Sequence, residues 1–463
     1  NSLYPHLIMQ YNLSPETLIT DTLPAELQEI KDMPPGVDGL IDQNISLDIL
    51  EKYKLTYTPN NEFYLTGKQG FLPEMMQQIY NDRVKFKGMM IDAKKKLQKE
   101  KDFNERKELQ KSISKYNNMQ MNLKITLNSA FGAMGNQHFR FFDQRIAEAI
   151  TTSGQLSIRW IEKSLNEYLN KLLNSTGVDY VIASDTDSVY IRFDELIDKV
   201  LKKRTDESED SYRGRAVDFL DTIAREKIEP FIDSCYKDLA EYVNAFDQKM
   251  QMAREVIADK GIWTAKKRYI LNVYDSEGVK YKEPKLKIMG IESVRSSTPE
   301  WCRNHIQDLI KIIINTDEET VMKSIAEYRE EFNNLSFDQI AFPRSVNGIE
   351  KYTSSKSIYN KGTPIHVRGV LLFNHLLRKH KLTKKYQSIR EGEKIKFSYL
   401  KEPNTLQENV ISVSTHLPKE FQLDKYIDYE LQFNKAFLEP MKVILDAIGW
   451  NVEKVANLEL FFG

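Results

Sequence analysis

The stretch that decides the fold reads YVIASDTDSVYIRF and spans residues 180–193. Two apolar, β-prone runs, residues 180–183 and 189–193, flank the polar segment Ser184-Asp185-Thr186-Asp187-Ser188, which predicts a β-hairpin with two carboxylates in its turn. Aspartates in a rigid turn suit a divalent metal, because Mg²⁺ takes one or two carboxylates and leaves its other positions to water and phosphates. The alternative is that Asp, Thr and Ser stand here only because they form turns readily.

Length and composition set limits on the fold and on the class of protein. The 463 residues are enough for two to four lobes. With 66 Lys+Arg against 67 Asp+Glu, the net charge of -1 does not indicate a nucleic-acid binder, so local charge has to decide. Cys235 and Cys302 are the only cysteines, which excludes a disulfide framework and a cysteine zinc site and fits a reducing cytosol. No membrane span and no signal peptide is visible, so we expect no membrane partner.

Residues 72–135 predict two long antiparallel helices on either side of a charged break near residues 99–105. Asp102 followed by Glu105 has the spacing of a capping box, so we expect the second helix to begin there. Between Arg83 and Lys124 there are thirteen Lys or Arg and five Asp or Glu, a surplus of eight positive charges. Apolar residues recur at intervals of three and four: Met76, Ile79, Phe86, Met90, Ala93 and Leu97, then Tyr116, Met119, Leu123, Leu127, Ala130 and Met134.

A second motif lies near the end of this region, at residues 124–132. On a helix, Lys124, Asn128 and Phe131 share one face, and a cation, an amide and a ring together suit a phosphate and a base. Arg83 and Lys87 stand four apart on the preceding helix, and antiparallel pairing would bring both sets to one end of the hairpin. A triphosphate would meet several cations there. The alternative is a solvated basic helix pair.

The rest of the chain predicts further helices and two β-prone stretches. After residue 136 we expect a helix with one apolar face, on which Gly154 would allow close approach to a sheet. The other residues of this face are Ile146, Ile150, Ile158, Ile161, Leu165, Tyr168 and Leu172. Helices follow the carboxylate hairpin from Ala216 to about Asn244. Residues 263–271 and 281–289 are β-prone, with residues 275–278 as a turn between them, and the pattern beyond Ile291 is mostly helical.

Together with Ser2-Leu3-Tyr4-Pro5 at the start, these segments make the sequence resemble family B DNA polymerases, most closely the replicative polymerases of T-even-like tailed bacteriophages. The resemblance covers essentially the whole chain. It implies an α+β fold, a polymerase right hand with an antiparallel-sheet palm, a two-helix fingers hairpin and a mostly helical thumb. The implied domains are the first part of the palm at 1–69, the fingers at 70–136, the second part of the palm at 137–290, and at 291–463 the thumb with a C-terminal clamp-binding tail.

The resemblance also implies an activity and assigns residues to it. The activity is template-directed addition of dNTPs to a primer 3′-hydroxyl by two-metal phosphoryl transfer, with two Mg²⁺ ions as cofactors. Asp187 is the implied principal metal ligand, Asp185 tunes its coordination, and Lys267 supports it. The ring of Tyr4 matches the gate that excludes a 2′-hydroxyl. The implied dNTP-binding residues are Ser2, Leu3, Tyr4, Arg83, Lys87, Lys124, Asn128 and Phe131. The implied DNA-binding residues are Lys266, Lys267, Arg268, Tyr269, Lys285 and Lys287, and the implied clamp-binding residues are Leu458, Leu460, Phe461 and Phe462.

Partners follow from the same resemblance. In family B an aspartate of the first motif stands two residues before the position of Asn1, so we expect this chain to need an upstream polymerase fragment that supplies this aspartate and the 3′-5′ exonuclease. Glu255 matches a further acidic position beside the metals, but Ala253 replaces its usual acidic neighbour. The other implied partners are primer-template DNA, dNTPs and a sliding clamp, in the cytoplasm of an infected bacterial host.

Two other functions would share some of these features. A non-catalytic primer-template-binding subunit derived from a polymerase would need no triphosphate site, so the presence of Asp185, Asp187, Arg83 and Lys124 together argues against it. A reverse transcriptase also shows paired aspartates in a hairpin. It would not explain residues 124–132 together with the basic segment at Lys266.

Overall fold

The computed structural model describes residues 3–354 and 357–450. The chain divides into two compact units, Asn1–Ile257 with Asp275–Lys280, and Ala258–Tyr274 with Tyr281–Gly463. Each unit is described by itself. Helices dominate both units and the sheets are small and antiparallel, so the expected α+β class is confirmed. No helix among the described residues is long and apolar enough to cross a membrane.

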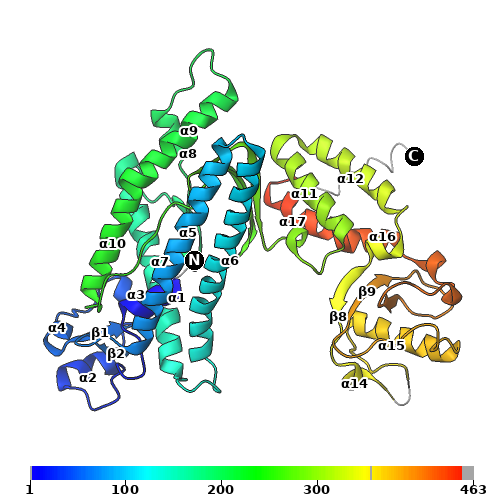
Figure 1. The fold of residues 1–463 in the computed structure, drawn as a ribbon, viewed down its shortest axis with the longest axis horizontal. Coiled ribbons are helices and arrows are strands. Elements are labelled where there is room, and N and C mark those ends of the chain that lie inside the picture. Colours follow the sequence, from blue (N-terminus) through cyan, green and yellow to red (C-terminus); the bar gives the residue numbers. More distant parts are fainter. Residues whose placement is uncertain (1–2, 355–356, 451–463) are drawn as a thin grey trace. The chain divides into compact units, whose positions relative to one another are not determined.

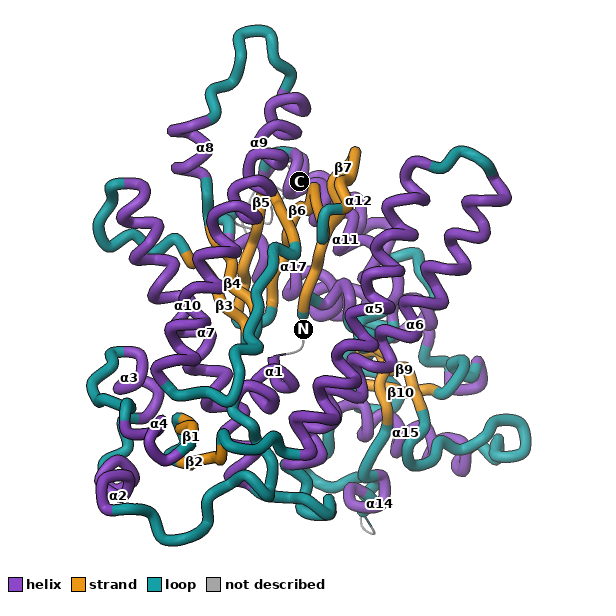
Figure 2. The backbone as a smooth tube through the Cα atoms, turned by 60° about the vertical axis from the view of Figure 1, so that its left-hand side comes forward, coloured by secondary structure: helices purple, strands orange, loops and turns teal. Residues whose placement is uncertain are grey.

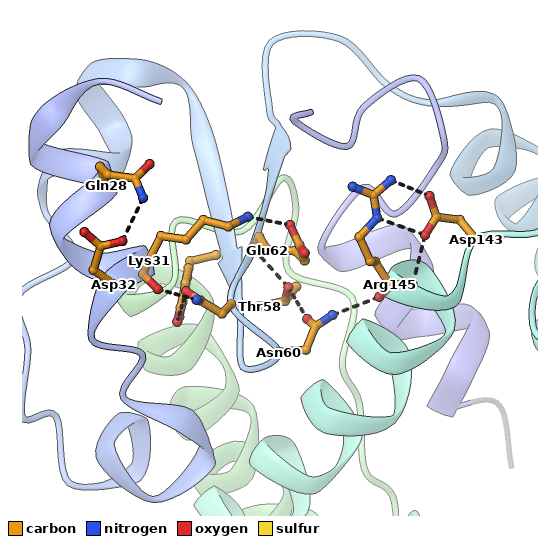
Figure 3. Close-up of polar contacts among 10 residues, drawn as sticks. Gln28, Lys31, Asp32, Thr58, Asn60, Glu62, Asp143 and Arg145 are labelled. Carbon is orange, nitrogen blue, oxygen red and sulfur yellow. Dashed lines mark hydrogen bonds and ion pairs between the residues drawn. The ribbon is translucent and has the colours of Figure 1, made fainter. Parts of the chain in front are cut away.

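The first unit begins with a buried helix and a small hairpin. Helix α1 places Leu7, Ile8 and Met9 in the core. Figure 3 shows how the β1–β2 hairpin is tied to its surroundings: Lys31 of α2 pairs with Glu62 at 3.0 Å, and Asn60 donates to the Arg145 carbonyl at 2.9 Å. The elements are α1 (Leu3–Gln10), α2 (Ala25–Asp32), α3 (Gly36–Ile41), α4 (Ile49–Tyr53), β1 (Leu55–Thr58) and β2 (Glu62–Leu65).

The two predicted long helices are confirmed as α5 (Phe71–Lys99) and α6 (Phe103–Met134), which lie side by side (Figure 1). Asp102 is the N-cap of α6, as predicted, and its carboxylate accepts from the Glu105 N–H at 2.9 Å. The Asp102 N–H donates instead to Glu100, at 2.9 Å, so the acid that completes the cap lies before the helix. Leu72, Met76, Met90, Ala93, Leu127 and Met134 are buried between the helices and their neighbours.

The predicted helix after residue 136 is α7 (Gln144–Leu173). Two details of its expected face are wrong. Leu172 is 50% exposed, and Leu169 and Leu173 are buried in its place, because the helical period turns the stripe over 30 residues. Gly154 faces helix α1 and no sheet, since a Cβ added there would meet Leu3 and Leu7 at 3.4 and 3.5 Å.

Helices α7 and α10 (Glu229–Tyr242) pack together through aromatic rings, and both can be followed in Figures 1 and 2. Tyr168 stacks on Phe231 with ring centroids 4.2 Å apart, and Trp160 donates to the Cys235 carbonyl at 3.0 Å. Between these two helices in sequence lie β3 (Val181–Asp185), β4 (Ser188–Ile191), α8 (Asp194–Val200), α9 (Glu209–Ile223) and the π-helical segment η1 (Ala224–Ile228). Strands β3 and β4 pair antiparallel, which confirms the predicted hairpin.

A three-stranded sheet of order β5-β6-β7 follows, drawn in orange in Figure 2. Its strands are β5 (Val256–Ala265), β6 (Arg268–Ser276) and β7 (Val279–Met289). The expectation of one β-prone run over residues 263–271 is wrong, because Lys266 and Lys267 form a turn that divides it. The second expected turn is confirmed. Glu277 and Gly278, with φ of 51° and 79°, form its two central residues, as a type I′ hairpin turn requires.

The second unit is mostly helical, as expected, but it also contains a sheet that the sequence did not reveal. This sheet has the order β10-β9-β8 and all its pairs are antiparallel. Helix α15 packs closely on it at Gly369, where any Cβ would collide with Ser412. The elements are η2 (Glu292–Val294), α11 (Glu300–Asn315), α12 (Glu318–Phe332), α13 (Phe337–Ile340), β8 (Phe342–Ser345), α14 (Ile349–Tyr352), α15 (Ile365–Lys379), β9 (Lys394–Tyr399), β10 (Val410–Val413), η3 (Lys419–Phe421), η4 (Asp424–Tyr426), α16 (Tyr429–Phe433), η5 (Asn434–Leu438) and α17 (Glu439–Ala447).

Candidate functional site

The carboxylate turn joins β3 to β4 with only Thr186 and Asp187 between the paired residues Asp185 and Ser188. The Asp187 N–H donates to the Asp185 carbonyl at 2.5 Å, and the Thr186 hydroxyl donates to the Asp185 carboxylate at 3.0 Å. Thr186 has a φ of 56°. A β-branched residue in this left-handed region is strained, and such strain concentrates at functional sites.

Both aspartates of the carboxylate turn fit a hard divalent cation. Asp185, the last residue of β3, and Asp187 in the turn after it are both half-exposed. Tyr236 of α10 lies within the electrostatic reach of Asp187: burial raises the pKa of this phenol most, and Cys235 and Asp187 raise it further. Among the residues that the structure describes, no three His, Cys, Asp or Glu are grouped to hold a metal. Two carboxylates are nevertheless what Mg²⁺ commonly takes from a protein beside phosphates.

Helix α1 brings two of the predicted nucleotide-binding residues together. The ring of Tyr4 lies 4.5 Å from the ring of Phe131 on α6, centroid to centroid, although 127 positions separate them in sequence. Two residues further along α1, His6 packs edge-on against Tyr80 of α5 at 4.4 Å. Two aromatic contacts therefore fix α1 against the helix pair. Ser2, the first predicted residue of this segment, lies outside the described residues.

The predicted cations of α5 lie beside an acidic residue that the sequence analysis did not assign to the site. Lys87 pairs with Glu277 at 2.6 Å. Arg83 is only 6% exposed, and burial lowers the pKa of its guanidinium while Tyr80 and Glu277 oppose that shift. Glu277 therefore forms an ion pair with Lys87 and opposes the lowering of the Arg83 pKa. The only signal in the sequence was the turn Asp275-Ser276-Glu277-Gly278, which gave no indication of which helix it would contact.

The residues predicted on α6 share one face, as expected, since Lys124, Asn128 and Phe131 stand four and three apart on an uninterrupted helix. Lys124 is half-buried and Asn128 is exposed. Because α5 and α6 pack along each other and meet near residue 101, Arg83 lies about level with residue 119 and Lys87 about level with residue 115, so Lys124 is about 7.5 Å and about 13.5 Å from these levels along the axis. The expected meeting of the two sets at one end of the hairpin stays a prediction.

The predicted DNA-binding residues belong to the second unit. Lys266 and Lys267 are exposed at the β5–β6 turn, and Lys267 has a φ of 62°. Gly290, also left-handed at 67°, packs against the Lys267 carbonyl so closely that no Cβ would fit. Arg268 forms a two-pronged ion pair with Glu292, at 2.9 and 2.6 Å.

The remaining predicted DNA-binding residues differ in exposure. Tyr269 is only 6% exposed and lies in the core. Lys285 is exposed, with its ammonium 4.3 Å above the ring of Tyr281, and Lys287 is half-buried. The predicted clamp-binding residues Leu458, Leu460, Phe461 and Phe462 lie outside the described residues.

Comparison with known proteins identifies the family. The sequence profile described as DNA polymerase family B matches residues 1–205. The DNA-directed DNA polymerase of Enterobacteria phage T4 is 33% identical over 503 aligned residues, which cover 100% of this chain and 54% of that protein. The chain belongs to DNA polymerase family B. The predicted resemblance to this family, and to its T-even-like phage members, is confirmed.

Two further relatives show how far the similarity extends. The DNA-directed DNA polymerase of Escherichia phage RB69 is 33% identical over 507 residues, covering 99% of this chain and 54% of that protein. The DNA polymerase alpha catalytic subunit of Trypanosoma brucei brucei is 23% identical over 403 residues, covering 86% of this chain and 24% of that protein. The chain thus spans about half the length of the two phage relatives.

Proposed function

We propose that this chain is the C-terminal polymerase portion of a replicative family B DNA polymerase, which adds dNTPs to a primer 3′-hydroxyl as a template directs. In this proposal residues 1–69 and 137–290 form the palm, 70–136 the fingers and 291–463 the thumb. The family match and the alignment of phage DNA polymerases along the whole chain support DNA synthesis as the activity.

The contact between Tyr4 and Phe131 is the observation that carries the proposal. It brings residues of α1 and α6 together at 4.5 Å, in the same compact unit as the carboxylate turn. Phe131 would line the base pair being formed, with Asn128 beside it, and the Tyr4 ring would leave no room for a 2′-hydroxyl. Ser2 and Leu3 would complete this pocket, while Arg83, Lys87 and Lys124 would bind the phosphates.

Asp185 and Asp187 would hold the Mg²⁺ ions, with Lys267 supporting their coordination. The bound metals would lower the pKa of the primer hydroxyl and neutralise charge on the leaving pyrophosphate. Two divalent ions beside a triphosphate need more carboxylate ligands than the two that this turn supplies. We therefore include in the proposal an upstream polymerase fragment, which contributes a further aspartate together with a 3′-5′ exonuclease.

The remaining partners are also part of the proposal. Lys266, Lys267 and Lys285 are exposed cations suited to the phosphates of a primer-template duplex, with Arg268, Tyr269 and Lys287 alongside them. Leu458, Leu460, Phe461 and Phe462 would bind a sliding clamp. Because the relatives named above include polymerases of two bacteriophages, we place the activity in the cytoplasm of an infected bacterium.

Primer extension tests this function. The 463-residue chain, combined with the upstream fragment, should extend a labelled primer in the presence of Mg²⁺ and dNTPs. Asp187→Asn should lower the rate by about 10³-fold or more, because it removes the charge that holds metal in the transition state. Asp198→Asn is the matched control, since Asp198 is an exposed acid on α8 and its loss should leave the rate unchanged.

The same experiment separates the proposed function from a duplex-binding subunit without catalysis. If the combined chains bind primer-template but neither extend it nor bind a dNTP with Mg²⁺, the polymerase proposal fails and the binding subunit takes its place. Full extension by the 463-residue chain alone would overturn the proposed requirement for the upstream fragment.

A further inference from the structure

The β6–β7 turn presents a carboxylate to the basic face of α5. Glu277 at its tip pairs with Lys87 at 2.6 Å, and both side chains are about one-third exposed, at 29% and 33%. The next contacts lie along the same face of the helix, since Gln98 donates to the Lys280 carbonyl at 3.3 Å and a Cβ on Gly278 would meet the Lys95 ammonium at 3.8 Å. All of these residues belong to the first compact unit.

The turn is held rigidly in this position. The buried Asp275 carboxylate accepts from the Gly278 N–H at 2.9 Å and pairs with Arg254. Arg254 pairs in addition with Asp221 of α9, and the Glu277 N–H donates to the Glu255 carbonyl at 2.7 Å. A carboxylate at the tip of a turn fixed in this way is preorganised, so it needs little ordering to meet a cation on α5.

We propose that Glu277 is a positioning residue that occupies the triphosphate-binding face of α5 until a nucleotide replaces it. This inference rests on the proposed function, because it takes Arg83 and Lys87 as the cations that receive the triphosphate. The carboxylate of Glu277 and a phosphate oxygen need the same ammonium of Lys87. Binding of the triphosphate therefore breaks the contact between α5 and the turn, which couples nucleotide capture to release of the helix.

The ion pair between Glu277 and Lys87 is weak enough for a triphosphate to displace it. An ion pair that is about one-third exposed contributes little and is screened by salt, so a triphosphate, with its higher charge, displaces it readily. Until then the pair holds Lys87 in place, and the charge of Glu277 also opposes the burial that lowers the pKa of the Arg83 guanidinium. Glu277 therefore lowers the affinity of the empty site for anions while keeping its cations aligned.

Binding of inorganic triphosphate to the 463-residue chain, followed by titration calorimetry at low ionic strength, tests this inference. Glu277→Gln should lower the dissociation constant by about two- to five-fold, the factor that an ion pair of this exposure is worth. The gain should disappear when the same change is made in a Lys87→Met background, as expected for two residues that act through one contact. Glu319→Gln is the matched control, because Glu319 pairs with Lys323 at 2.8 Å on α12 of the other unit, and it should change nothing.

The outcomes separate the two proposals. If the unchanged chain binds triphosphate and Glu277→Gln binds it no more tightly, the positioning role is wrong while the nucleotide site stands. A fall in the midpoint of thermal unfolding with unchanged affinity would show that the pair is only structural. If none of these proteins binds triphosphate, the assignment of Arg83 and Lys87 fails, and the role of Glu277 fails with it.

Discussion

The β3–β4 turn and the β6–β7 turn both place acidic side chains at a two-residue hairpin connection, but they are built differently. In the β6–β7 turn the two left-handed positions fall on Glu277, which is not β-branched, and on Gly278, and Asp275 is completely buried in an ion pair with Arg254. In the β3–β4 turn the strained position falls on Thr186, and both aspartates remain half-exposed. The β6–β7 turn, which contacts α5 through Glu277, is fixed by the buried ion pair between Asp275 and Arg254. The β3–β4 turn, for which we propose metal binding, keeps its aspartates half-exposed and carries backbone strain at Thr186.

Removing the ion pair under the β6–β7 turn should have the largest effect. Arg254→Met leaves the Asp275 carboxylate buried without its cation, and breaking a buried pair from one side costs about 3 kcal/mol or more. Urea unfolding should show this loss in the free energy of unfolding. Arg225→Met is the control, because Arg225 is 63% exposed, lies 3.7 Å from Asp221, and its removal should cost less than about 0.5 kcal/mol. An equal loss of stability in both variants would mean that the buried ion pair under the β6–β7 turn contributes no more than an exposed ion pair.

Strain introduced into the β6–β7 turn should have an intermediate effect. Gly278 has a φ of 79°, and a Cβ there meets nothing closer than 3.8 Å, so Gly278→Ala changes only the backbone energy. We expect the free energy of unfolding to fall by about 1 kcal/mol. Gly214→Ala, within α9 and with open space around it, should instead raise it by about 0.5 to 1 kcal/mol. A rise in both variants would show that position 278 tolerates a residue with a side chain.

The features predicted correctly from the sequence are those that short-range signals specify. The apolar repeats of α5 and α6 and the N-cap at Asp102 lie within a few residues of the structure they determine. The β3–β4 hairpin follows from two β-prone runs around a polar turn. The contact between Tyr4 and Phe131 is different, because it joins segments that no local pattern relates, and the roles assigned to these two residues stay predictions.

The features that were missed depend on contacts between distant residues. The chain has 48 residues between Ser345, the last residue of β8, and Lys394, the first residue of β9, so no hairpin signal links the two strands. The division of residues 263–271 at Lys267 depends on Gly290, whose lack of a side chain lets the turn close. The pair of Lys87 and Glu277 spans 190 positions, and in the sequence Glu277 shows only the signature of a turn.

Relief of strain in the β3–β4 turn should have the smallest effect and the opposite sign. Thr186→Asn keeps a polar side chain but removes the β-branch at a φ of 56°, where asparagine is tolerated far better than threonine. We expect the free energy of unfolding to rise by about 0.5 kcal/mol, as measured by urea unfolding. Thr222→Asn in the last turn of α9 is the control and should change it little, because the two residues have similar helix propensities. If Thr186→Asn lowers the stability, the carboxylate turn carries no strain, and the contrast between the two turns reduces to the buried ion pair under one of them.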